Sequence, residues 1–472
     1  MPIDTSERVF ESEIEYCLTH LGKKSERYIK GDSRDFDRSL ALDGKMLIAF
    51  VQDTQPDKWQ AIVRRHGAED AAQNLLQRVG IELDKRGTID CLRKGINDIG
   101  VEVRLAYWKP GSHMNQSALA LYEKNRLSIT RQVKYATDSE HSIDTVLFVN
   151  GIPVITMELK NPLKGQTYRD AIAQYQKDRS PREKLLSFKK RALVHFAVDT
   201  DEVWMTTRLD KLDTKFIPFN RGHVDGSAGN PPVKGDYCTA YLWKEVLRRD
   251  SFLDILQRFV QLQKDKKNGH ERIIFPRYHQ LDVVRKLVAD VKQRGCGHSY
   301  LIQHSAGSGK SNSIAWLAHH LESLHDADEQ VIFHSIIVIT DRRVLDKQLQ
   351  RDIFSMEHKQ GVVVRVSRNA KQLTEALEKG ARIIVCTLQK FPFVDVQRIC
   401  TTGKRFAIIV DEAHSSQSGK ASERMKEVLA DISTYDGEAI EQRLHEYAVA
   451  EAKAEEETLD RDEELVDEIK KA

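Results

Sequence analysis

The stretch Tyr300–Ser311, YLIQHSAGSGKS, runs from three apolar residues through a turn rich in glycine and serine into Lys310 and Ser311. A helical pattern follows it over 312–321. The order of strand, glycine turn and helix is typical of a phosphate-binding loop, where backbone N–H groups, a helix N-terminus and a lysine hold phosphate oxygens. The stretch therefore predicts a nucleoside triphosphate site in an α/β domain.

The parts of this loop have separate expected roles. We expect Lys310 to bind the β- and γ-phosphates of ATP, and Ser311 to ligate Mg²⁺. The turn that presents the backbone amides consists of Ala306, Gly307, Ser308 and Gly309. The full loop template has a glycine where this chain has His304, so only its second half is present. The alternative is a chance glycine turn before a helix.

Apolar strand patterns alternate with helical patterns beyond the loop. The predicted strands cover 335–340, 362–366, 382–386 and 406–410. Such alternation predicts a parallel sheet covered on both faces, with its ligands bound at the carboxyl ends of the strands.

The last of these strands opens the stretch Phe406–His414, FAIIVDEAH. It delivers Asp411 to the strand end, where the carboxylate can hold the same Mg²⁺ as Ser311. Glu412 can orient or deprotonate the attacking water, and His414 can couple the nucleotide to loops that grip DNA. Phosphoryl transfer depends mainly on such positioning and charge neutralisation.

A second informative stretch is Ile143–Lys160, IDTVLFVNGIPVITMELK. Two apolar strand patterns meet at Asn150-Gly151, which is a strong signal for a hairpin. Asp144 and Glu158 stand within these strands, and carboxylates in a buried strand are costly unless they bind something.

The turn decides whether these two carboxylates share a face. A strict two-residue turn sets Asp144 against Met157, on the face opposite to Glu158. A three-residue loop that bulges at Gly151 sets Asp144 against Thr156, so that the two carboxylates become diagonal neighbours on one face. We predict the bulged loop.

Lys160 follows Glu158 by two positions and shares its face. Two neighbouring carboxylates can share a Mg²⁺, which activates a water and neutralises charge on a phosphodiester, while an ammonium completes the site. The hairpin therefore predicts a metal-dependent nuclease site. The alternative is a surface hairpin with an ion pair.

The order of Asp144, thirteen intervening residues, Glu158 and Lys160 resembles the PD-(D/E)xK nuclease signature. The wider stretch NGIPVITMELKNP resembles the nuclease domain of the type I restriction endonuclease motor (R) subunit. By this resemblance Asp144 and Glu158 are metal ligands, and Lys160 positions water or stabilises charge. The family also has a QxxxY element on the next helix; Gln174 matches its glutamine, but Asp178 stands where the tyrosine is expected.

The phosphate loop and the DEAH stretch resemble a RecA-like lobe of a superfamily 2 helicase. Gln280 lies 30 residues before Lys310 and resembles the glutamine that reads adenine in that superfamily. The alternative is a polar residue at a helix N-terminus. The loops at 341–343 and 387–391 resemble the helicase elements that grip the DNA backbone.

One further helix is predicted over Glu7–Leu21, where apolar residues recur at helical spacing. Glu11, Glu13 and Glu15 lie on it. We predict that these carboxylates form a solvated helix face, the alternative being that one of them points into a site.

The fold class that we expect is α/β, in four parts. They are a PD-(D/E)xK-like mixed α/β endonuclease domain at 1–240, a helical linker at 241–268, a RecA-like motor lobe at 269–436, and a charged helical or disordered tail at 437–472. Nothing after His414 predicts a second motor lobe. By the resemblance we expect an N-terminal portion of a longer motor subunit, which binds ATP without efficient turnover or translocation.

Composition narrows the class of protein only moderately. The net charge is +2, with −6 in residues 451–472 and +8 in the remainder, which fits a nucleic-acid partner weakly. Basic clusters lie at 189–191 and 264–267. The six cysteines form no CxxC pair, which favours reduced thiols over zinc or disulfides. No signal pattern or long apolar run is present, so we expect a cytoplasmic protein with no membrane partner.

The resemblance implies the restriction subunit of a type I restriction-modification enzyme. Such a subunit would couple ATP-driven translocation of double-stranded DNA to Mg²⁺-dependent cleavage, in complex with modification (methyltransferase) and specificity subunits. One alternative is a superfamily 2 DNA helicase whose N-terminal domain binds nucleic acid without cutting it. Another is an inert truncation product that competes for assembly.

Overall fold

The computed structural model describes residues 7–411, apart from 113, 265–268, 306, 341–348, 350–352, 355–361, 367–369 and 394–403, together with 425 and 428. The predicted tail at 437–472 and the loop at 341–343 lie outside the described residues. The chain divides into two compact units, Met1–Asp282 and Val283–Ala472.

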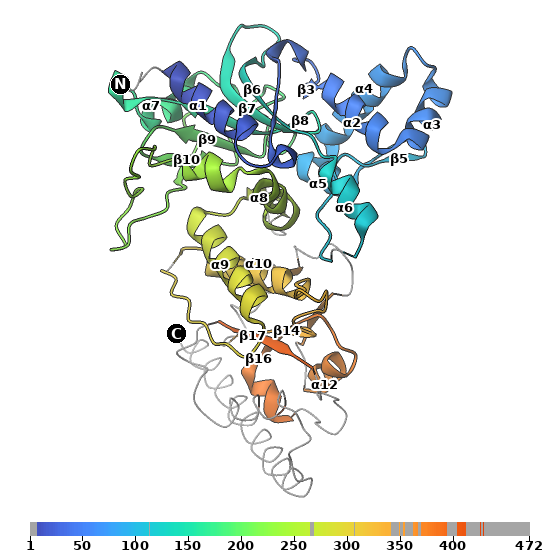
Figure 1. Cartoon of the computed structure of the whole chain (residues 1–472), viewed down its shortest axis with the longest axis vertical. Coiled ribbons are helices and arrows are strands. Elements are labelled where there is room, and N and C mark those ends of the chain that lie inside the picture. Colours follow the sequence, from blue (N-terminus) through green and yellow to red (C-terminus); the bar gives the residue numbers. More distant parts are fainter. Residues whose placement is uncertain are drawn as a thin grey trace, which may run out of the picture. The chain divides into compact units, whose positions relative to one another are not determined.

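The first unit is built on a seven-stranded mixed sheet with the order β1-β6-β7-β8-β9-β10-β11 (Figure 1). Strand β7 runs antiparallel to both β6 and β8, whereas β1 with β6 and β8 with β9 are parallel pairs. The strand bounds are β1 (Ile29–Lys30), β6 (Leu127–Lys134), β7 (Ser142–Val149), β8 (Ile152–Leu159), β9 (Val194–Val198), β10 (Val203–Thr206) and β11 (Ile217–Pro218). The two strands predicted on either side of Asn150-Gly151 are confirmed as β7 and β8.

Helices and short ladders complete this unit. The helices are α1 (Glu7–His20), α2 (Gly44–Thr54), α3 (Pro56–His66), α4 (Ala71–Arg86), α5 (Thr88–Lys94), α6 (Gln116–Glu123), α7 (Tyr168–Lys177) and α8 (Arg249–Asp254). The ladders are β2 (Phe36–Asp37) with β3 (Leu42–Asp43), β4 (Ile96–Asp98) with β5 (Val101–Val103), and β12 (Gln261–Lys264) with β13 (Glu271–Ile274). Pro56 can begin α3 because the N–H groups of the first helical turn have no partner within the helix, so the N–H that proline lacks is not missed. Gly67 ends α3 with a φ of +85°.

The helical linker predicted at 241–268 does not form one helix over its described residues, 241–264. The segment consists of a π-helical turn (Leu242–Val246), α8, a second π-helical turn (Ile255–Phe259) and then β12. Trp243, Phe252 and Phe259 are fully buried, because the segment packs within the first unit on several sides. An amphipathic helix with one solvated face could not bury these side chains together.

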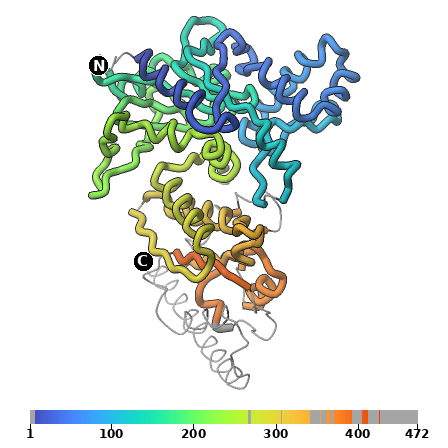
Figure 2. Tube along the Cα trace, in the orientation of Figure 1, coloured from blue at the N-terminus to red at the C-terminus, as the bar shows by residue number. Residues whose placement is uncertain are grey.

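This segment, residues 242–260, closes against the N-terminal part of the chain. The ring of Phe10 in α1 meets the ring of Trp243 edge-on at 5.6 Å. The hydroxyl of Tyr28 donates to the carbonyl of Leu247 at 2.7 Å, across 219 positions of sequence. Figure 2 follows the chain path from blue α1 to the yellow-green segment of the same unit. The two ends of the unit thus complete one core.

The second unit contains a four-stranded parallel sheet with the order β15-β16-β14-β17. Its strands are β14 (Ser335–Thr340), β15 (Val363–Arg365), β16 (Ile383–Thr387) and β17 (Phe406–Val410), and its helices include α10 (Lys310–Glu322) and α12 (Ala370–Glu378). Helix α9 (Tyr278–Arg294) crosses the boundary between the units. Leu373 and Leu377 of α12 pack with Ile337 and Ile339 of β14 in a buried cluster. The predicted parallel sheet is confirmed.

The strand predicted over Tyr300–Ile302 is wrong. These residues are in no strand, and the Leu301 side chain is 89% exposed. The sheet ends at β17, where Ile408 is 39% exposed, and no other strand among the described residues pairs with its outer edge. An apolar run without a neighbouring strand has no ladder to join.

Among the described residues, no helix is both long and apolar enough to cross a lipid bilayer.

Candidate functional site

A tight turn joins β7 and β8. Val149 pairs with Ile152, so the turn consists of two residues, Asn150 and Gly151, which both have positive φ angles of +51° and +83°. The predicted three-residue loop with a bulge at Gly151 is therefore wrong. Glycine is required at this point, since a β-carbon would lie 2.3 Å from the carbonyl oxygen of Asp43.

The register of the hairpin shifts two residues beyond this turn. Phe148 pairs with Pro153, whereas Leu147 pairs with Ile155. Val154 is therefore the extra residue of a bulge in β8. Proline has no N–H to donate to a ladder, which explains why the irregularity occurs beside it.

The bulge brings the two carboxylates onto the same face. Thr145 pairs with Met157, and the next pair along this register sets Asp144 directly across from Glu158. The predicted position of Asp144 against Thr156 is wrong, but the prediction that the two carboxylates share one face is confirmed.

Asp144 is buried, and both of its carboxylate oxygens accept hydrogen bonds. Oδ2 accepts from the backbone N–H of Leu159 at 2.9 Å. Oδ1 accepts from Nε2 of Gln132 at 3.3 Å. The carboxylate is thus held between β6 and β8, beside Glu158.

Glu158 is fully buried, and its two oxygens differ. Oε1 accepts from Nε of Arg179 at 2.6 Å, whereas the buried Oε2 has no hydrogen-bond partner in the described part of the chain. Burial and then the charge of Asp144 raise the pKa of Glu158 well above its usual range, although Arg179 opposes this shift. A divalent cation at Oε2 would satisfy this oxygen and offset both carboxylates.

Lys160 is the third residue of the predicted site and is also buried. Its Nζ lies 2.9 Å from Oε1 of Glu7 in α1. Burial disfavours the charged ammonium, but the bond to Glu7 and the charges of Asp144 and Glu158 outweigh it and raise the pKa of Lys160. The ammonium therefore stays charged close to both carboxylates.

Two acidic residues of α1, Glu11 and Glu15, face the sheet. Glu11 and Glu15 are buried, so the predicted solvated face is wrong for both. Glu11 and Glu15 each form an ion pair with Arg131 of β6, at 2.8 and 3.5 Å. Their spacing of four residues, shared with Glu7, was the sequence signal for a common helix face.

Two residues in and just beyond the helix after the hairpin, neither of them the predicted Gln174, contact the hairpin. Tyr175 of α7, next to Gln174, places its hydroxyl 2.8 Å from Oγ1 of Thr156. Arg179, just beyond α7, supplies the cation for Glu158. Sequence reasoning missed Arg179, although a carboxylate predicted in a buried strand implied a basic partner.

Thr156 also lies 2.7 Å from Nδ1 of His195 on β9. Burial lowers the pKa of His195 from 6.5 to about 3, so between these values the unfolded state binds a proton that the folded state does not. Stability should therefore fall as the pH drops below 6.5. We expect His195→Asn to remove about 2 kcal/mol from the fall in stability between pH 7 and pH 5, measured by urea unfolding. An unchanged slope would contradict the assignment.

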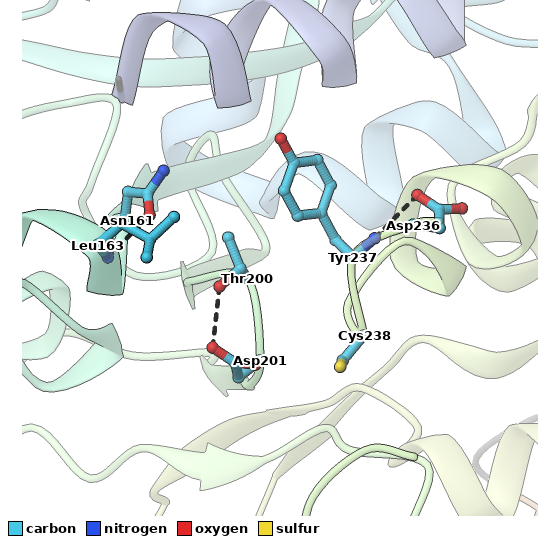
Figure 3. Close-up of a pocket in the computed structure, with 7 residues that line it drawn as sticks. All are labelled: Asn161, Leu163, Thr200, Asp201, Asp236, Tyr237 and Cys238. Atoms are coloured by element: carbon cyan, nitrogen blue, oxygen red, sulfur yellow. Dashed lines mark hydrogen bonds between the residues drawn. The ribbon is translucent and has the colours of Figure 1, made fainter. Parts of the chain in front are cut away.

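A pocket of about 230 Å³ adjoins the end of β8. Figure 3 shows Asn161 and Leu163 on one side of it and Asp236, Tyr237 and Cys238 on the other. Asp144, Glu158 and Lys160 do not line it. The pocket is therefore separate from the predicted nuclease site.

The phosphate loop of the second unit has the predicted turn. Gly307 and Gly309 have φ angles of +73° and +86°, and α10 begins at Lys310 with Ser311 in its first turn. Nζ of Lys310 lies 3.0 Å from Oδ1 of Asp411, at the end of β17. The structure thus brings together Lys310 and Asp411, two residues that the sequence assigns to one nucleotide site.

The structure describes Gln280, another residue of the predicted nucleotide site. Gln280 is buried near the start of α9, where its Oε1 accepts from the N–H of Arg277 at 3.0 Å. Such a bond is typical of a polar residue that caps a helix N-terminus. Ala306, Glu412 and His414 lie outside the described residues.

His304, which replaces the first glycine of the loop template, spans the turn. Its Nδ1 lies 3.0 Å from Oγ of Ser308. The side chain thus joins the two sides of the turn.

Two known families match separate parts of the chain. Residues 74–214 match the N terminus of the type I restriction enzyme R protein. Residues 279–460 match the SWI2/SNF2 ATPase family. The first match contains the hairpin carboxylates, and the second contains the phosphate loop and β17.

Several curated proteins are similar over much of the chain. A putative type I restriction enzyme MjaVIIIP endonuclease subunit of Methanocaldococcus jannaschii is 25% identical over 367 residues, covering 70% of this chain and 33% of that protein. The HindI endonuclease subunit of Haemophilus influenzae is 26% identical over 301 residues, covering 58% and 26%. The chain therefore spans about a quarter to a third of the length of these relatives. It is similar to the type I restriction enzyme endonuclease subunits, and its second half matches the SWI2/SNF2 ATPase family.

Proposed function

We propose that the chain acts as the restriction subunit of a type I restriction-modification enzyme and cleaves double-stranded DNA with Mg²⁺. The observation that carries this proposal is the buried pairing of Asp144 and Glu158, with the free Oε2 of Glu158 beside a second carboxylate. A PD-(D/E)xK-like nuclease domain in the first unit accounts for this arrangement, since two such groups would otherwise be costly to bury.

The residues present fit a Mg²⁺ ion. No three His, Cys, Asp or Glu side chains converge as a metal cage within the described part of the chain. Mg²⁺ does not need such a cage, because it usually retains several waters and uses one or two carboxylates. Asp144 and Glu158 would hold it. When bound, it would supply an activated water and neutralise charge on the phosphodiester.

The neighbouring cations would complete the site. Arg179 fixes one oxygen of Glu158, which leaves the other oxygen available as a ligand. Lys160 lies near both carboxylates and can hold a water or stabilise the charge on the phosphate. For this, its ammonium would move away from Glu7 and toward the substrate. Gln174 of α7, which matches the glutamine of the QxxxY element, would support the site without binding the metal.

In a longer motor subunit of the expected kind, cleavage would be coupled to ATP-driven translocation, and the second unit would supply one side of the ATP site. Lys310 would exchange Asp411 for the β- and γ-phosphates, while Ser311 and Asp411 would hold Mg²⁺. Glu412 would orient the attacking water, and His414 would relay the nucleotide state to DNA-contacting loops. Gln280 would read the adenine, and modification and specificity subunits would direct the complex to DNA.

The test is cleavage by the chain assembled with modification and specificity subunits, ATP, Mg²⁺ and DNA. We expect Asp144→Asn to lower the cleavage rate by at least about a hundredfold, because it removes a ligand charge, and to leave ATP binding unchanged. Asp201→Asn, in the separate pocket of Figure 3, makes the same chemical change and should cleave normally. Normal cleavage by Asp144→Asn would refute the assignment of the nuclease site to Asp144, and no cleavage by the wild-type complex would favour a helicase with a DNA-binding N-terminal domain.

A further inference from the structure

A row of polar side chains crosses three neighbouring strands of the first unit. Gln132 stands in β6, Asp144 in β7 and Glu158 in β8. The pairing of β6 with β7 continues on both sides of Gln132, at Arg131 and Val133, but skips Gln132 itself. The register therefore sets Gln132 level with Asp144, at an irregular point in the ladder.

Gln132 adopts a backbone conformation that its residue type disfavours. Its φ is +50°, in the left-handed region where glycine, asparagine and aspartate are the common residues. Such conformations persist only where the surrounding structure enforces them, and they cluster at functional sites. The contacts of the Gln132 side chain explain why this conformation is maintained.

The amide of Gln132 bridges two carboxylates. Nε2 donates to Oε1 of Glu11 at 2.9 Å and to Oδ1 of Asp144 at 3.3 Å. Oε1 accepts from the hydroxyl of Ser142 at 2.9 Å, which fixes the orientation of the amide. With Leu159 donating to the other oxygen of Asp144, both oxygens of this carboxylate are restrained.

A neutral donor suits this place better than a charged group. A lysine or arginine beside Asp144 would compete with a metal ion for the carboxylate. Another carboxylate would add a like charge next to Glu11 and Asp144. The amide orients Asp144 through hydrogen bonds and leaves its full negative charge available.

We propose that Gln132 is a positioning residue of the metal site. It holds the Asp144 carboxylate toward Glu158 and ties it to Glu11 of α1. This inference rests on the proposed function, because it assigns a role within the same site.

The test measures Mn²⁺ binding to the nucleotide-free full chain by isothermal titration calorimetry, without any assay of cleavage. We expect Gln132→Gly, which accepts the positive φ but lacks the amide, to weaken Mn²⁺ binding about tenfold. Its metal-free melting temperature should stay within about 4 °C of wild type. Gln132→Asn also tolerates the conformation, but its side chain is too short to bridge both carboxylates, so it should weaken binding similarly.

Two further variants calibrate the measurement. Ile99→Gly is a matched control, because Ile99 has a φ of +45° in the exposed β4–β5 turn and should bind Mn²⁺ as wild type does. Asp144→Asn defines the binding that belongs to this site.

The possible outcomes separate the two proposals. Wild-type affinity in Gln132→Gly and Gln132→Asn, with reduced binding in Asp144→Asn, would overturn the role of Gln132 alone. Equal Mn²⁺ binding by wild type and Asp144→Asn would overturn the metal site itself and, with it, this inference.

Discussion

Replacing Arg179 by methionine is expected to lower the free energy of unfolding by about 3–5 kcal/mol, because it leaves Glu158 buried without its cation. Arg179 is itself buried. Its Nε donates to Glu158 at 2.6 Å, and its Nη2 donates to the carbonyl of Ser142 at 2.8 Å. The guanidinium thus joins the start of β7 to the middle of the site.

Denaturant unfolding of the full chain, followed by a signal from the first unit, measures this cost. The double variant Arg179→Met, Glu158→Met should recover most of the loss, since apolar side chains of similar volume often replace a buried ion pair without penalty. Arg34→Met is the matched control, because Arg34 pairs with Asp32 on the exposed surface and should show no measurable change. A loss below about 1 kcal/mol in Arg179→Met would contradict the assigned pairing.

Replacing Lys310 by alanine is expected to weaken ATP binding about a hundredfold. The lysine would supply charged hydrogen bonds to the β- and γ-phosphates, and each such bond contributes about 1.5–3 kcal/mol. The ammonium of Lys310 lies 3.0 Å from Asp411, the other residue that we predict to act at this site.

Titration with a fluorescent ATP analogue in the presence of Mg²⁺ measures this affinity. Lys379→Ala removes an exposed lysine of the same unit and should bind the analogue as wild type does. Unchanged binding by Lys310→Ala would show that the loop does not hold the phosphates.

The nucleotide loop was largely predictable from sequence because its geometry is local. Gly307, Gly309 and Lys310 belong to one short stretch, and Asp411 ends an apolar strand whose neighbours are also apolar. The run at 300–302 was not predictable in the same way. A strand forms only where another strand pairs with it, and no described strand pairs with these residues, although the outer edge of β17 is unpaired among the described strands.

The hairpin shows where local rules fail. The dipeptide Asn150-Gly151 correctly indicated a turn, but the register depended on Pro153, which moved the bulge into β8. The shared face of Asp144 and Glu158 was predicted correctly, but from a bulge at Gly151 that the structure does not contain. The bulge in β8 that produces this shared face was not predicted.

Partners from distant parts of the chain could not be assigned from the sequence. Arg179 reaches Glu158 only after α7 has turned the chain back along the sheet. Glu7 and Glu11 meet the site because α1 packs on strands more than a hundred positions later. Helical spacing identified a common face of α1 but did not tell whether water or protein covers it.

The closure of residues 242–260 against α1 has a consequence for synthesis of the protein in the cell. Phe10 leaves the ribosome early, but Trp243, which covers it, follows 233 positions later. At a synthesis rate of about 5–20 residues per second, Trp243 is made on the order of tens of seconds after Phe10. During that interval its apolar face is available to chaperones and proteases, so completion of the first unit is tied to translation through residue 260.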